Sequence, residues 1–239
     1  MFHPLDHPME RGWVGRIDGD RVIHLAAQTL QSLFTGGGTA REHAVYPLAE
    51  VRLLAPVLHP PAVRVFDDQT TFAFANPAAI AGPGADVVTR SRGEPGSGTP
   101  GNSLLQGRLT LLPRVAGVIG ADGALAGFTA FADWRDPARV PPKDRDFALG
   151  LGPVVVTSDE LDADGLEAVI RVDGSERARG AFRDFDWELA RELAAERTVL
   201  KPGDLLAGPS ALVEEIPRGS VVELELVGIG VLEQIAGGD

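Results

Sequence analysis

The chain of 239 residues contains no cysteine, which excludes disulfide bonds, thiolate zinc sites and thiol nucleophiles. It also lacks clusters of Lys and Arg. With 22 basic and 34 acidic residues, its formal charge is -12, which argues against a nucleic-acid partner because phosphate binding requires basic patches. No apolar run is long enough to span a bilayer, and residues 1–11 lack a basic and then apolar leader. We therefore expect a cytoplasmic protein with no membrane partner.

Hydrophobic residues make up 44% of the chain, enough to form a full-sized core. The 29 glycines and 18 prolines separate short runs of Val, Leu and Ile, which is typical of many short strands joined by turns. Residues 12–25 predict two strands joined by a turn at residues 18–20, because Asp-Gly between apolar runs favours a hairpin. Residues 26–33 predict a short helix that ends at the glycines that follow.

Two later segments have clear periodicity. Residues 186–197, DWELARELAAER, predict a helix with acidic residues near its start. The side chains available to one face of this helix are those of Trp187, Leu189, Ala190, Leu193 and Ala194. Residues 220–226 alternate apolar and polar side chains and predict a half-buried strand. Glu223 and Glu225 on this strand look like a metal motif, but we expect them to form its solvated face.

Residues 90–102, RSRGEPGSGTPGN, contain no hydrophobic side chain and predict a flexible loop. A glycine-rich loop that binds phosphate is the alternative. We favour the plain loop because no Gly-Lys-Ser/Thr ending and no helix start follow the glycines.

Residues 127–157, GFTAFADWRDPARVPPKDRDFALGLGPVVVT, carry the most informative motifs of the chain. Gly-Phe-Thr is followed by Asp133, Arg-Asp, Lys-x-x-Asp and Leu-Gly-Pro-Val-Val-Val-Thr, and this order resembles the core of the fumarylacetoacetate hydrolase (FAH) superfamily. The matching positions are Asp133, Arg135, Asp136, Lys143, Asp146, Gly152, Pro153 and Thr157. Residues 72–84, 200–204 and 218–230 are similar to further motifs of the same superfamily.

The resemblance implies a β-rich α+β fold, an FAH-type mixed β-sandwich or roll with a small N-terminal domain. Residues 51–57 are similar to the link between the two domains. We expect the N-terminal domain to comprise residues 1–58 and the FAH-like domain residues 59–239, with the boundary near Pro60.

The resemblance also implies a divalent cation, held by a Glu-x-Glu pair on one strand and by the Asp at position 133. Oxygen ligands of this kind suit Mg²⁺. Counting back from the Ala-Gly-Val-Ile-Gly at residues 116–120, the two Glu positions fall on Leu112 and Arg114, and neither residue is a metal ligand. Glu94 is the nearest substitute. We therefore expect no cofactor, with Mg²⁺ or Mn²⁺ bound at Asp133 only if the site is rebuilt from other residues.

Further site residues are implied by the resemblance. Lys143 matches a lysine that polarises a substrate carbonyl, and its alternative is a surface lysine in a Pro-rich turn. We expect Lys143 and Asp133 to be the catalytic pair, if any, and Arg135, Asp146 and Ser210 to face a substrate. Residues 67–71 are too few for the lid that carries the general base in the superfamily. The three histidines outside any motif are expected at the surface: His24, His43 and His59.

Three hypotheses follow for the function. The first is a non-catalytic protein that binds a small carboxylate or pairs with an active paralogue. The second is a metal-free hydrolase, lyase or isomerase that uses Lys143 and Asp133, and the third is a metal enzyme with relocated ligands. A homodimer is the simplest assembly, and a heteromer with a paralogue is its alternative.

The charges of Arg114 and Asp133 predict which group takes the place of the cation. Arg114 contributes one positive charge where the superfamily has a carboxylate, and Asp133 retains one negative charge. We expect Arg114 or Lys143 to pair with Asp133 in a charge-assisted contact. The alternative is that Arg114 points to solvent after Pro113.

Overall fold

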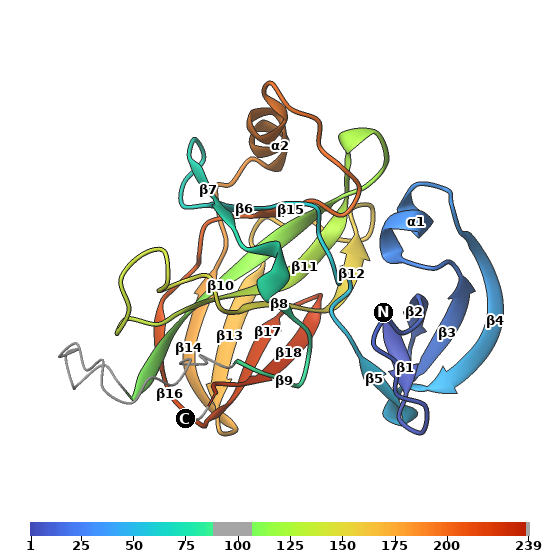
Figure 1. The fold of residues 1–239 in the computed structure, drawn as a ribbon, viewed down its shortest axis with the longest axis horizontal. Coiled ribbons are helices and arrows are strands. Elements are labelled where there is room, and N and C mark those ends of the chain that lie inside the picture. The colour runs from blue at the N-terminus through green and yellow to red at the C-terminus, as the bar shows by residue number, and fades with distance from the viewer. Residues whose placement is uncertain (88–106, 238–239) are drawn as a thin grey trace.

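The computed structural model describes residues 1–87 and 107–237, so the loop expected at residues 90–102 and Glu94 lie outside the described residues. The described chain is β-rich, with a smaller N-terminal part beside a larger body (Figure 1). This agrees with the predicted β-rich α+β class. None of the described helices is long and apolar enough to cross a membrane.

The N-terminal part contains two small sheets. One pairs β1 (Phe2–Pro4) with β5 (Val51–Leu53), and the other has the order β2 (Gly15–Asp18), β3 (Arg21–Ala26) and β4 (Thr39–Pro47). A short 3-10 helix, Leu48–Glu50, lies between β4 and β5. The predicted hairpin is confirmed: Asp18 pairs with Arg21, and Gly19 adopts φ +59° in the turn, a conformation that glycine reaches without strain.

The short helix predicted at residues 26–33 begins later than expected. Helix α1 spans Leu30–Phe34, because Thr29 accepts a hydrogen bond from the Ser32 backbone while the Ser32 hydroxyl faces the Thr29 backbone N–H. This reciprocal capping sets the first turn of a helix. Leu30 and Phe34 pack against the core of the large sheet, so α1 connects the N-terminal part to the body.

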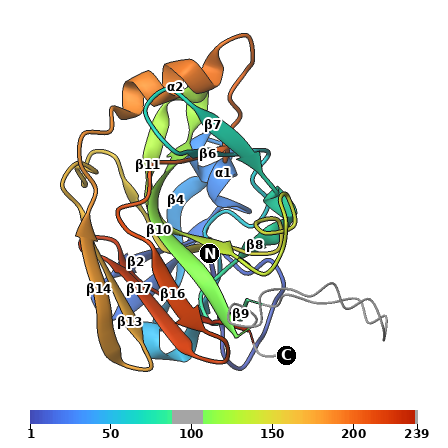
Figure 2. The same cartoon turned by 90° about the vertical axis from the view of Figure 1, so that its left-hand side faces the viewer.

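The body is built around an eight-stranded sheet with the order β7-β6-β15-β10-β11-β12-β8, in which β16 also pairs with β10. Its strands are β6 (Val63–Phe66), β7 (Phe72–Ala75), β8 (Ile80–Ala81), β10 (Arg108–Ile119), β11 (Leu125–Arg135), β12 (Leu149–Thr157), β15 (Leu205–Ala207) and β16 (Glu214–Pro217). Two 3-10 helices, Pro77–Ala79 and Ala121–Gly123, lie in its connections. The long strands β10 and β11 form the centre of the sheet (Figure 2).

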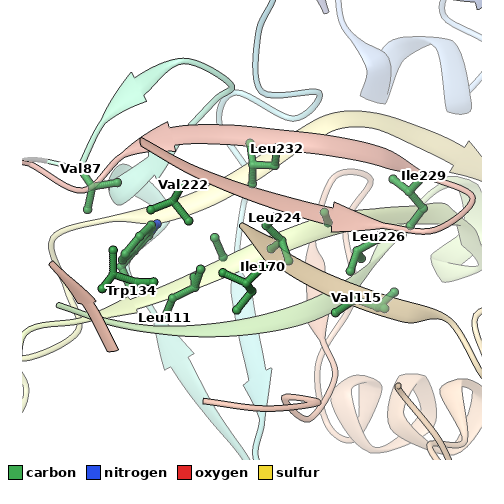
Figure 3. Close-up of a cluster of buried hydrophobic side chains, with 14 of the residues drawn as sticks. Val87, Leu111, Val115, Trp134, Ile170, Val222, Leu224, Leu226, Ile229 and Leu232 are labelled. Carbon is green, nitrogen blue, oxygen red and sulfur yellow. The ribbon is translucent and has the colours of Figure 1, made fainter. Parts of the chain in front are cut away.

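A five-stranded sheet packs against the large one. Its order is β14-β13-β17-β18-β9, from β9 (Ala85–Asp86), β13 (Glu167–Val172), β14 (Ser175–Ala181), β17 (Val221–Leu226) and β18 (Gly230–Ile235). Figure 3 shows the core between the sheets, where Val115 and Trp134 face Ile170, Leu224 and Leu232. The alternation predicted at residues 220–226 is confirmed. Glu225 on the outer face lies 2.7 Å from the Arg171 guanidinium, as expected for a solvated strand face.

Helix α2 spans Trp187–Ala195 and confirms the helix predicted at residues 186–197, with Asp186 as its N-cap. Ala190 and Ala194 are buried and pack against Phe66 and Leu206 of the large sheet. Leu189 is exposed, contrary to the predicted apolar face. The helix lies over the end of the sheet formed by β6 and β15 (Figure 1).

The described strands before Pro60 pair only with one another. The boundary between residues 1–58 and 59–239 stays a prediction, since Leu30 and Phe34 cross it in packing.

The N-terminal sheet generates a pH prediction at His24. The His24 ring stacks on Trp13 with centroids 4.7 Å apart, and His43 lies 5.3 Å away. Burial, and secondarily the charge of His43, lowers the pKa of His24 below its ordinary value. At a pH between the lowered pKa of His24 in the folded protein and its ordinary pKa in the unfolded chain, the unfolded chain binds more protons than the folded protein. The stability of the fold should therefore fall as the pH drops through the unfolded-state pKa toward the folded-state pKa.

An NMR titration of the histidine rings measures this shift. In His43→Gln, the pKa of His24 should rise only part of the way toward the ordinary value, because the larger cause, burial, remains. His59→Gln is the control, since His59 lies outside this aromatic cluster. A wild-type His24 that titrates at or above the ordinary pKa would contradict the prediction.

Candidate functional site

The antiparallel register of β10 and β11 brings the candidate site together. Leu112 pairs directly with Asp133, and Arg114 lies two residues further along β10. Since alternate residues of a strand point to the same face, Arg114, Asp133 and Arg135 share one face of the sheet. The positions aligned with the superfamily's metal ligands therefore remain close in space, although two of the three side chains have changed.

Asp133 lies between two guanidinium groups. Arg114 Nε donates to Asp133 Oδ2 over 3.1 Å. Arg135 binds the same carboxylate in a bidentate manner, with Nε 2.9 Å from Oδ1 and Nη2 2.7 Å from Oδ2. Both carboxylate oxygens thus accept charge-assisted hydrogen bonds, which are the strong kind. Asp133 is 2% exposed and Arg114 is 1% exposed, so this contact lies in the protein interior.

Arg114 also binds groups outside its own hairpin. Its Nη1 donates to the carbonyl oxygens of Phe66, at 2.7 Å, and Gly208, at 3.0 Å. Its Nη2 lies 3.3 Å from the carboxylate of Asp67. A guanidinium carries five N–H donors in a planar fork, and here they bind two carbonyls and two carboxylates. The side chain therefore joins β10 to the end of β6 and to the segment after β15.

The charges at the site balance. Arg114 and Arg135 supply two positive charges, and Asp133 and Asp67 supply two negative ones. Burial acts to lower the pKa of Arg135, but the hydrogen bonds and charge of Asp133, with Asp144 and Asp67 beyond, raise it overall. Arg135 therefore stays charged at any physiological pH.

The expected contact between Asp133 and a cation is confirmed for Arg114, and the solvent-facing alternative for Arg114 is wrong. For Lys143 the structure gives a different partner: its Nζ lies 2.6 Å from Asp146 Oδ2. The Lys143 side chain is 69% exposed. This position fits the alternative of a surface lysine in a Pro-rich turn.

The other residues expected to face a substrate have partners within the fold. Arg135 uses two donors on Asp133, and Asp146 accepts from Lys143. The Ser210 hydroxyl lies 2.9 Å from the Pro113 carbonyl and 2.6 Å from the Leu212 carbonyl, so its proton is directed at the backbone.

The pocket beside Asp133 is small, with a volume of about 20 Å³. A cavity of this size holds about one water molecule. Its walls are formed by Val65, Asp67, Ala73, Phe74, Ala75, Asp133, Arg135 and Arg145.

A divalent cation does not fit this set of residues. The positions that would supply two more carboxylates hold an apolar side chain, Leu112, and a buried guanidinium, Arg114. Both oxygens of Asp133 already accept from guanidinium groups. Within residues 1–87 and 107–237, no group of three His, Asp or Glu side chains could hold a metal ion. Hard cations require several oxygen ligands, and the two carboxylates of this site, Asp133 and Asp67, both bind guanidinium groups.

Three further ion pairs, each with a buried carboxylate, were not predicted from the sequence. Asp136 accepts from Arg139 and from Arg218, each over 3.1 Å. Arg64 donates to Asp204 over 3.1 Å, and both side chains are buried. The only signal in the sequence was that Asp136 and Asp204 stand in motifs of the superfamily; nothing marked Arg64 or Arg218 as their partners.

Comparison with known proteins agrees with this architecture. The family model described as fumarylacetoacetate (FAA) hydrolase C-terminal matches residues 112–235, which is more than half of the chain. The chain belongs to the FAH superfamily. An uncharacterised protein of Pyrococcus abyssi is 32% identical over 95 residues, and the chain matches 42% of the length of that relative.

Solved structures share the fold of this FAH-superfamily protein. FAH from Exiguobacterium antarcticum has a TM-score of 0.75 at 19% identity, with 96% of each chain covered. Maleylpyruvate hydrolase from Sphingobium sp. SYK-6 has a TM-score of 0.72 at 21% identity, covering 96% of this chain and 98% of that one. A second crystal structure of that hydrolase, at 20% identity, contains manganese(II) and pyruvate. A 2-hydroxyhepta-2,4-diene-1,7-dioate isomerase from Mycobacterium marinum has a TM-score of 0.71 at 22% identity, covering 93% and 92%.

The contact between Arg114 and Asp133 generates a stability prediction. Arg114→Met leaves a buried carboxylate with one partner fewer and two carbonyls without their donor, and should cost about 3 to 5 kcal/mol in the free energy of unfolding. In an Asp133→Asn background the same substitution should cost less, because the uncompensated charge is absent. Chemical denaturation of the four variants of this cycle measures the coupling.

Arg108→Met is the matched control on the same strand. Arg108 forms a solvent-exposed ion pair with Glu215 at 2.9 Å, and its loss should cost about 0 to 1 kcal/mol. Equal costs for the two Arg→Met substitutions would refute a structural role for the buried contact.

Proposed function

We propose that this protein is a non-catalytic member of the FAH superfamily with respect to the metal-dependent reactions of its relatives. In this view the protein binds a small carboxylate or acts as the partner subunit of an active paralogue. The observation that carries the proposal is the position of Arg114, whose guanidinium binds Asp133 from a strand position aligned with a metal ligand. The only aligned carboxylate that remains is thereby neutralised.

Electrostatics supports this reading. Two unit charges 4 Å apart interact by about 4 kcal/mol at an effective dielectric constant of about 20, so a divalent ion beside one fixed guanidinium meets a repulsion of about 8 kcal/mol. A metal at Asp133 would have to displace Arg114 from its four partners: Asp133, Asp67 and the carbonyls of Phe66 and Gly208.

The alternative of a metal-free enzyme has less support. As a general base, Asp133 would need a free oxygen to receive a proton, but both of its oxygens already accept hydrogen bonds from guanidinium groups. Lys143, its expected electrophilic partner, binds Asp146 at the surface instead. The alternative with relocated metal ligands lacks a suitable carboxylate cluster in the described chain.

Self-association is the second part of the proposal. Val221 of β17 pairs directly with Ile235 of β18, and both side chains are partly exposed at one end of the outer face, whose remaining positions carry Val231 and the acidic Glu223, Glu225 and Glu233. An exposed apolar pair at the end of a sheet face can contact another surface. We expect a homodimer, with a heteromer containing a paralogue as the alternative.

The proposal predicts that Mg²⁺ and Mn²⁺ do not stabilise the protein through this site. A ligand present at 100 times its dissociation constant adds about 2.7 kcal/mol to the stability of the native state. Thermal melts with and without millimolar Mn²⁺ should therefore coincide. The double variant Leu112→Glu/Arg114→Glu restores three carboxylates, and its melting temperature should rise with Mn²⁺, provided that circular dichroism shows it to be folded.

Asp133→Ala in the double variant is the matched control and should abolish the gain. Stoichiometric binding of Mn²⁺ to the unmodified protein, lost in Asp133→Ala, would overturn the proposal.

The assembly is tested separately by light scattering on the protein expressed alone. The expected mass is twice the chain mass of 25.2 kDa. Val231→Lys, on the outer face of β18, should shift the mass toward the monomer, whereas Arg108→Met should not. A monomer at micromolar concentration would count against the homodimer and favour the heteromer.

A further inference from the structure

A second cavity lies where the N-terminal segment meets the start of the body. Its volume is about 180 Å³, and it is lined by Met1, Arg11, Gln28, Thr29, Gln31, Pro56, Leu58 and His59. It shares no lining residue with the pocket beside Asp133. The cavity is therefore separate from the site aligned with the superfamily's metal centre.

The charge of this cavity differs from that of the protein as a whole. The chain has 34 acidic and 22 basic residues, yet none of the lining residues is acidic. Arg11 supplies a positive charge, and the His59 ring supplies nitrogen atoms that can form hydrogen bonds. In the part of the chain that the structure describes, neither side chain forms an ion pair with a carboxylate. An unpaired guanidinium in an acid-free cavity selects for an anion.

The remaining lining residues supply both polar and apolar contacts. The side-chain amides of Gln28 and Gln31 have no hydrogen-bond partner among residues 1–87 and 107–237, so their donors and acceptors are available. Pro56 and Leu58 form an apolar wall. A ligand for this cavity therefore combines an anionic group with a short carbon skeleton.

Volume distinguishes this cavity from the pocket beside Asp133. An apolar cavity of about 150 Å³ accommodates benzene, so 180 Å³ admits a compact organic acid of similar size. The pocket beside Asp133, at about 20 Å³, has room for about one water molecule. A small carboxylate fits the cavity of about 180 Å³ and does not fit the pocket beside Asp133.

We infer that the cavity lined by Arg11, Gln28, Gln31 and His59 binds a compact organic carboxylate. The carboxylate group lies against the Arg11 guanidinium, with the amides and the imidazole beside it, and the carbon skeleton packs on Pro56 and Leu58. This cavity would be the place where the protein binds the small carboxylate of the proposed function, and the inference rests on the proposed function in that respect. Because the walls come from residues 1–31 and 56–59, a bound ligand also holds the segment of α1 against the body.

Calorimetry with pyruvate, succinate and benzoate as probes at pH 7 tests the inference. At least one of these acids should bind the wild-type protein, and Arg11→Gln should weaken binding by about tenfold or more. His59→Gln should weaken it less. Arg16→Gln is the matched control, because it removes the same charge from the neighbouring strand, where Arg16 pairs with Glu42 outside the cavity. It should leave the affinity unchanged. Hydrogen exchange should slow in residues 28–34 when the acid is bound.

Three results would overturn the inference. The first is no binding of any of the three acids at millimolar concentration. The second is binding that survives Arg11→Gln but is lost in Arg135→Gln, which would place the ligand beside Asp133 and leave the proposed function intact. The third is equal binding of inorganic phosphate, which would identify a general anion site. The thermal melts with Mn²⁺ test separately whether a metal binds at Asp133. The carboxylate site and the absence of a metal can therefore be refuted independently of each other.

Discussion

Asp133 carries a charge that is almost entirely removed from water, and the surrounding structure is organised to compensate it. Arg135 binds it from the same strand and Arg114 from the neighbouring strand. Arg114 then uses its remaining donors on the carbonyls of Phe66 and Gly208, so a single side chain connects the middle of the large sheet to two segments distant in sequence. Such a cluster need not be more stable than apolar packing, but removal of one member leaves an uncompensated charge.

Under the proposed function, the scaffold is retained while the metal-dependent chemistry is not. The core between the two sheets, with Trp134 and Val115 on one side and Leu224 on the other, does not depend on a metal. The position aligned with the metal site needs a positive charge beside Asp133. In this protein the Arg114 guanidinium supplies that charge. Fold and function are separable in this way because function resides in a few side chains placed on a common framework.

The sequence predicted the local structure and the central contact, and the reasons for its failures are physical. The pairing of Arg114 with Asp133 followed from motif spacing and charge balance, and the hairpin at Gly19 followed from turn chemistry. The contact of Arg135 with Asp133 was not predicted, because the resemblance assigned Arg135 to a substrate instead. Arg218 and Asp136 are 82 residues apart, and Arg64 and Asp204 are 140 apart, so only the folded topology brings them together. The later start of α1 depends on Thr29, whose side chain competes for the backbone before the helix begins.

Anomalous diffraction from crystals soaked in Mn²⁺ tests the central claim most directly, because it locates the ion and the side chains together. We expect no manganese peak at the Asp133 carboxylate, and the Arg114 guanidinium should remain bonded to Asp133, Phe66 and Gly208. A manganese ion on Asp133, with Arg114 displaced from the carboxylate, would contradict this expectation.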